Sequence, residues 1–90
     1  MEPQQISEIV TGIVNEVAYG SKTFKTAKEI KEESILKEDS GRDTLELDSL
    51  DMTDLQLKLE GEFNISIPDE DVPNWDTVGD VIKYIEGKAI

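Results

Sequence analysis

A serine with acidic neighbours is the residue of this chain whose type and position could take part in chemistry. Ser49 stands between Asp48 and Leu50, within a leucine- and acid-rich run from Leu45 to Phe63. The chain contains no histidine and no cysteine, so the common Ser-His and Cys-His nucleophile systems cannot be built from its own residues. We therefore interpret Ser49 as a non-catalytic residue and predict that the chain is not an enzyme.

The same composition limits the other reactive groups. Without cysteine or histidine the chain has no disulfide and no thiolate or imidazole zinc site. If the protein takes part in thiol or acyl chemistry, its reactive group must be added to the chain. The composition therefore favours a carrier or a binding module, and we expect no metal site.

An acidic, non-enzymatic interaction module is one alternative, and Ca²⁺ is one ligand to consider for it. Asp48, Asp51 and Asp54 are spaced three residues apart. An EF-hand loop instead places its acidic ligands two apart with a glycine following. The spacing does not match a calcium loop of that type.

The charge of the chain is strongly negative and uneven. The net charge is −12, and residues 43–82 hold twelve acids with Lys58 as their one base, whereas residues 21–42 carry six bases and five acids. Binding to nucleic acid by phosphate neutralisation is therefore not expected. A partner with a basic patch is one interpretation, and solubility of a small domain is the other.

The length and hydropathy of the chain predict a single domain over residues 1–90. No apolar run approaches the roughly 20 residues that a membrane span needs. The N-terminus lacks the basic and apolar regions of a secretory signal. We expect a cytoplasmic monomer that does not bind a membrane.

Apolar periodicity predicts a first helix over Gln4–Ala18 with six inward residues: Ile6, Ile9, Val10, Ile13, Val14 and Val17. Gly20 is its expected end. We interpret Ser21–Thr44 as a long connection with a helical turn in Ala27–Glu33 and a turn at Ser40–Asp43. Its apolar residues expected in the core are Ile30, Leu36 and Phe24.

The central run predicts a second helix with Asp48 or Ser49 as its N-cap. Its inward residues step by three or four: Met52, Leu55, Leu59 and Phe63. Leu55, Leu57 and Leu59 also alternate as in a strand, but the cap signal favours the helix. Leu57 then points away from the inward stripe, either as a contact residue or packed on a neighbouring loop.

The last third predicts a short helix opened by Pro68 and limited by Pro73, followed by a half-buried Trp75. Thr77 and Asp80 resemble a capping box for a final helix that Gly87 ends. The inward residues of that helix are Val78, Val81, Ile82 and Ile85. The sum is an all-α, four-helix antiparallel bundle of three main helices and one short helix, with a long loop after the first helix and no strands.

Four motifs at these distances closely resemble acyl carrier proteins: DSLD at Asp48–Asp51, EF at Glu62–Phe63, IPDED at Ile67–Asp71 and TVGDVIKYI at Thr77–Ile85. The resemblance implies that Ser49 carries a covalent 4′-phosphopantetheine arm, transferred from coenzyme A by a phosphopantetheinyl transferase. It also implies that acyl groups are carried on the arm as thioesters and that the helices surround a small cavity for the acyl chain.

The resemblance further implies that acyl-loading and acyl-using enzymes dock basic patches on the second helix. The corresponding residues of this chain are Asp48, Leu50, Asp51, Asp54, Leu57 and Glu60. The chain departs from the family pattern at Glu46, Thr53 and Gly61, and in the length of Ser21–Thr44. These departures favour a specialised carrier with its own cargo or its own enzymes.

An aminoacyl carrier of the D-alanyl or peptidyl type is the related alternative. The negative charge of the second helix argues against the peptidyl type. Fatty-acid, lipid and polyketide pathways all stay open for an acyl carrier.

Overall fold

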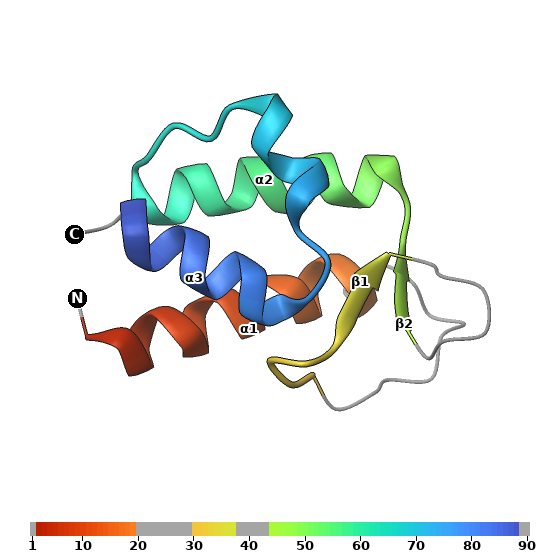
Figure 1. The fold of residues 1–90 in the computed structure, drawn as a ribbon, viewed down its shortest axis with the longest axis horizontal. Coiled ribbons are helices and arrows are strands. Elements are labelled where there is room, and N and C mark those ends of the chain that lie inside the picture. Colours follow the sequence, from red (N-terminus) through yellow and green to blue (C-terminus); the bar gives the residue numbers. More distant parts are fainter. Residues whose placement is uncertain (1, 20–29, 38–43, 89–90) are drawn as a thin grey trace.

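The computed structural model describes residues 2–19, 30–37 and 44–88, and its first helix, α1, spans Pro3–Tyr19. Of the six residues predicted to face inward, four are buried, namely Ile6, Val10, Val14 and Val17. Ile9 and Ile13 are partly buried. β-branched residues are weak helix formers, so packing must supply most of the stability of α1. That packing comes from α2 and α3, which both contact α1 and lie antiparallel to it (Figure 1).

The second helix, α2, spans Ser49–Phe63, so the helical interpretation of the central run is confirmed. Met52, Leu55 and Leu59 face the core. The helix ends at Asn64, whose φ of 54° lies in the left-handed region and whose N–H donates to the carbonyl oxygen of Glu60. Asparagine is one of the few residues other than glycine that occupy this region readily.

The short helix predicted to open at Pro68 is confirmed as a 3₁₀ helix, η1, over Asp69–Asn74, with Pro68 as its N-cap. The prediction that Pro73 limits this helix is wrong, because Pro73 lies inside it. Trp75 follows and is only 3% exposed, so the prediction of a half-buried ring is wrong. Its ring packs edge-on against Tyr84 of the last helix, with centroids 5.3 Å apart, and this contact is not visible from local spacing.

The last helix, α3, spans Val78–Lys88 and buries the four residues predicted for its inward face. The prediction that Gly87 ends it is wrong, because α3 continues through Gly87 to Lys88. A glycine in a last exposed turn lowers helix stability but does not by itself stop the helix.

Two short parallel strands, β1 (Ile35–Lys37) and β2 (Thr44–Leu47), lie within the connection after α1, so the prediction of no strands is wrong. Ile35 pairs with Thr44 and Lys37 with Leu47, with an irregularity between them. Segments of three and four residues are too short to show a periodic signal, and their pairing depends on backbone groups that every residue carries. The chain is nevertheless mostly helical, and the predicted fold class is confirmed.

The connection also supports the start of α3. The amides of Val78 and Gly79 donate to the carbonyl oxygens of Ser34 (3.0 Å) and Glu32 (2.7 Å). The predicted capping box is confirmed, because Thr77 Oγ1 accepts from the Asp80 amide and Asp80 Oδ2 accepts from the Thr77 amide. The exposed amides of the first helical turn are thereby satisfied.

Of the apolar residues expected in the core from the connection, Leu36 is fully buried and Ile30 packs against the core. Three of these predictions lie outside the described residues: Gly20, Phe24 and the turn at Ser40–Asp43. Of the helical turn predicted in Ala27–Glu33, residues 30–33 are described, and they form no helix but a hydrogen-bonded turn in which the Ser34 amide donates to the carbonyl oxygen of Lys31 at 3.0 Å. None of the helices in the described ranges is long and apolar enough to cross a membrane.

Candidate functional site

Ser49 is the first residue of α2, and its side chain is exposed. The N-cap is Asp48, whose Oδ1 accepts from the Asp51 amide at 2.8 Å, while Asp51 Oδ2 accepts from the Asp48 amide at 3.1 Å. Of the two cap residues left open by the sequence, the structure selects Asp48. The cap therefore does not use the Ser49 hydroxyl, and it holds that hydroxyl at a defined helix start.

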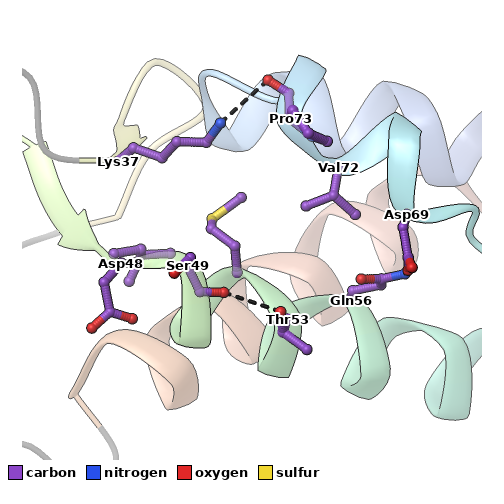
Figure 2. Close-up of a pocket in the computed structure, with 10 residues that line it drawn as sticks. Lys37, Asp48, Ser49, Thr53, Gln56, Asp69, Val72 and Pro73 are labelled. Carbon is purple, nitrogen blue, oxygen red and sulfur yellow. Dashed lines mark hydrogen bonds between the residues drawn. The ribbon is translucent and has the colours of Figure 1, made fainter.

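A pocket of about 500 Å³ opens beside Ser49 (Figure 2). Its walls come from β1, the end of β2, the first two turns of α2 and η1. Ten residues line it: Lys37, Leu47, Asp48, Ser49, Met52, Thr53, Gln56, Asp69, Val72 and Pro73. Its volume lies in the range of small-ligand pockets.

Lys37 brings a cation to the wall of this pocket. Its Nζ donates to the carbonyl oxygen of Pro73 at 3.2 Å, which links β1 to η1 (Figure 2). Sequence reasoning did not single out Lys37, because only the pairing of β1 with β2 brings it to the pocket that Ser49 also lines. No local pattern would have placed it there.

Gln56 is a second residue that sequence reasoning missed. Its side chain is only 8% exposed, and Nε2 donates to the carbonyl oxygen of Ile67 and to Asp69 Oδ1, both at 2.8 Å. A signal was present in the sequence, because Gln56 lies four residues after Met52 and three before Leu59, within the apolar stripe. A polar residue in such a stripe needs partners.

The predicted docking residues fall into two groups. Leu50 is 79% exposed and Leu57 is 60% exposed, and Asp48 and Asp54 are exposed near them along α2. Because Leu50, Asp54 and Leu57 are four and three residues apart, they share one side of the helix. The alternative in which Leu57 packs on a loop does not agree with its exposure.

The other two predicted docking residues, Asp51 and Glu60, are partly buried. Asp51 belongs to the capping box. Glu60 Oε2 accepts from the Ile67 amide at 2.9 Å, so it fastens the segment that follows α2. Within the described part of the chain, no group of three or more acidic side chains is arranged to hold a metal ion.

Two ionisable groups outside the pocket have shifted pKa values. Backbone hydrogen bonds from Thr77 and Asp76 hold the pKa of Asp80 below its usual value. Desolvation, followed by a 2.8 Å hydrogen bond to Asp71, raises the pKa of Tyr84 to about 12. These contacts fix the start of α3 and join α3 to η1, which forms one wall of the pocket.

Comparison with known proteins gives a family. Residues 23–85 match the family described as "Phosphopantetheine attachment site". The chain is also similar to a protein of Wolinella succinogenes named "Acyl carrier protein", with 51% identity over 59 residues, which cover 66% of this chain and 71% of that protein.

The helical fold presents an exposed serine at a capped helix start beside a pocket, and the two comparisons indicate a carrier class of protein. The chain belongs to the acyl carrier protein family, whose attached group is 4′-phosphopantetheine.

Proposed function

We propose that Ser49 is the residue to which 4′-phosphopantetheine is attached, and that the protein carries acyl groups as thioesters on this arm. The observation that carries the proposal is an exposed hydroxyl at the start of α2 beside a pocket of about 500 Å³. The protein then acts as a carrier and not as a catalyst. It delivers its cargo in the cytoplasm, as a monomer, to enzymes of fatty-acid, lipid or polyketide biosynthesis.

The attachment reaction needs only one atom of this chain. The Ser49 oxygen bonds to the phosphorus that bears the pantetheine portion of coenzyme A. The pyrophosphate linkage of coenzyme A breaks, and adenosine bisphosphate leaves with the bridging oxygen. The two carboxylates beside Ser49, those of Asp48 and Asp51, accept the hydrogen bonds of the capping box. The hydroxyl proton therefore passes to a base on the phosphopantetheinyl transferase.

The surroundings of Ser49 fit a phosphodiester. The amides of Ser49 and Leu50 lie in the first turn of α2, where no intrahelical acceptor exists, and helix N-termini favour anions. The carboxylates of Asp48 and Asp51 oppose a further negative charge there. Lys37 is the cationic side chain in the lining of the same pocket, and we expect its charge to offset part of this repulsion.

The pocket fits the cargo of such an arm. When attached, the arm ends in a thiol that holds an acyl group as a thioester. Leu47, Met52, Val72 and Pro73 give the pocket apolar walls, and burial of an alkyl chain against them is favourable by about 0.8 kcal/mol per methylene group.

We further propose that α2 is the docking face for the transferase and for acyl-loading and acyl-using enzymes. Two exposed leucines, Leu50 and Leu57, lie among acidic side chains on a helix whose surroundings hold few bases. A basic patch on the partner is complementary to this arrangement, and the leucines can fill apolar pockets at its centre. The full set of proposed contact residues is Asp48, Leu50, Asp51, Asp54, Leu57 and Glu60.

The attachment is tested by incubating the protein with coenzyme A and a phosphopantetheinyl transferase of broad specificity, followed by intact mass measurement. We expect the wild type to gain the mass of one arm and Ser49→Ala to gain nothing. Ser66→Ala removes another exposed serine, in the segment after α2, and serves as the matched control that should still be loaded. An arm on Ser49→Ala, or no gain on the wild type, would refute the assignment.

A further inference from the structure

The pocket beside Ser49 contains a hydrogen-bond acceptor that the protein does not use. Gln56 has one amide oxygen and two N–H donors. Both donors are consumed, one by the carbonyl oxygen of Ile67 and one by Asp69 Oδ1. Since both neighbours only accept in these contacts, the nitrogen must face them, and the orientation of the amide is determined by its partners.

The amide oxygen, Oε1, consequently points away from Ile67 and Asp69. Figure 2 shows the nitrogen end of Gln56 turned to Asp69 and the oxygen turned back toward the pocket that Gln56 lines. No donor within the described ranges bonds to this oxygen. In the same ranges, Trp75 Nε1 is the one side-chain polar atom that is both fully enclosed and without a partner. Gln56 Oε1 has no partner and is not in that class, so it is not fully enclosed.

Of the other polar side chains along the pocket, Asp48, Ser49, Thr53 and Asp69 are exposed to solvent and Lys37 is partly exposed. The Thr53 hydroxyl donates to the carbonyl oxygen of Ser49 at 3.0 Å, and Lys37 Nζ donates to the carbonyl oxygen of Pro73. Gln56 is therefore the buried polar side chain of the lining, and its Oε1 is the acceptor that a molecule deep in the pocket would meet. A purely alkyl occupant would cover it and remove its water without replacing the hydrogen bond, which is unfavourable.

We propose that the pocket selects acyl chains that carry a hydroxyl group, and that Gln56 Oε1 accepts the hydrogen bond from this hydroxyl. The inference rests on the proposed function, because it requires cargo on an arm at Ser49. Gln56 lies seven residues after Ser49 on α2, about 10 Å along the helix axis, and Figure 2 shows the two residues at opposite ends of the pocket. Ser49 thus lies at the end of the pocket where the arm is attached, and Gln56 lies at the end where it can bind the hydroxyl of the acyl chain.

The test compares matched cargo on the wild-type protein. Octanoyl, β-hydroxyoctanoyl and ω-hydroxyoctanoyl groups are installed from the corresponding coenzyme A thioesters by a broad transferase, and intact mass confirms one arm on each sample. Cleavage of each thioester by hydroxylamine is then timed and divided by the rate for the same acyl group on free pantetheine. A chain held in the pocket protects its thioester, so this ratio measures sequestration.

We expect at least one hydroxylated chain to be protected roughly two- to tenfold more than octanoyl, which is the range for one neutral hydrogen bond. Equal protection of all three chains, or better protection of octanoyl, would overturn the proposal without touching the attachment. Failure to load any cargo would instead defeat the proposed function, and the mass measurement distinguishes the two.

Gln56→Met assigns the effect to this residue, since methionine has similar length and no comparable acceptor. We expect the preference for the hydroxylated chain to disappear, whereas Gln4→Met, at an exposed glutamine of α1, should keep it. If Gln56→Met still protects the hydroxylated chain more than octanoyl, another group accepts the hydrogen bond from the hydroxyl. Gln56→Leu is the second variant if methionine prevents folding, and the wild-type comparison does not depend on either.

The arm itself carries amide N–H groups, which are a second possible donor of the hydrogen bond to Gln56 Oε1. The thermal unfolding midpoints of the unloaded and arm-bearing proteins, each as wild type and as Gln56→Met, separate the sources. We expect the arm without cargo to shift the midpoint equally in both backgrounds. A shift that needs Gln56 and no cargo would assign the acceptor to the arm and overturn the cargo assignment.

Discussion

Leu55 and Leu57 lie two residues apart on α2 and carry the same side chain in opposite environments. Leu55 is 0% exposed and Leu57 is 60% exposed. Truncation of a fully buried leucine to alanine costs about 2–5 kcal/mol, because apolar contacts are lost and a cavity remains. A substitution at an exposed position usually stays within about 0.5 kcal/mol. We therefore expect Leu55→Ala to be strongly destabilising and Leu57→Ala to be nearly neutral.

The size of the Leu55→Ala effect is large for a domain of this length. A chain of 90 residues has a free energy of unfolding of roughly 5–13 kcal/mol, so the loss removes a substantial fraction of it. The unfolding midpoint should fall by on the order of 10–30 °C. Trp75 is the single tryptophan and is buried against Tyr84, so urea or thermal unfolding can be followed by its fluorescence.

The same pair tests the docking face. Leu57→Ala should lower kcat/KM of the phosphopantetheinyl transferase by about tenfold at sub-saturating carrier, because an interface leucine at a contact centre contributes about 1–2 kcal/mol. Its stability should not change. A Leu57→Ala variant that unfolds early, or a Leu55→Ala variant as stable as the wild type, would contradict the packing of α2 described above. An unchanged kcat/KM for Leu57→Ala would remove Leu57 from the docking face.

Two further predictions concern charge. The pKa of Asp80 is lowered in the folded protein by the Thr77 and Asp76 amides. The ionised carboxylate therefore stabilises the folded state fully above the unfolded pKa of about 3.9, and this stabilisation is lost as pH falls through the folded pKa. Asp80→Asn should cost about 0.3–1 kcal/mol at neutral pH through the lost helix-terminal charge, and urea titrations should show this difference shrinking below about pH 4; a difference independent of pH would contradict the assignment. The net charge of −12 also predicts self-repulsion in the folded state, so added salt should raise the thermal midpoint of the unloaded protein, and a flat response in calorimetry would argue against it.

Local patterns in the sequence determined the helices and their caps. The stripe of α1, the capping box of Asp48 with Asp51 and that of Thr77 with Asp80 involve residues three or four apart, whose interaction depends only on helix geometry. The motifs around Ser49 also sufficed to suggest the family, which the comparisons then showed. The exposure of Leu57 followed from the same periodicity.

Only the tertiary structure decided what lies around Ser49. The pairing of β1 with β2 brings Lys37 to the pocket, and the packing of η1 on α2 gives Gln56 its two acceptors. Trp75 is buried because Tyr84 lies against it. These contacts join residues nine or more positions apart, through backbone groups, a carboxylate or aromatic rings, and they leave no local pattern. The tertiary fold, and not residue spacing, therefore builds the pocket and leaves the amide oxygen of the buried Gln56 without a hydrogen bond in the described ranges.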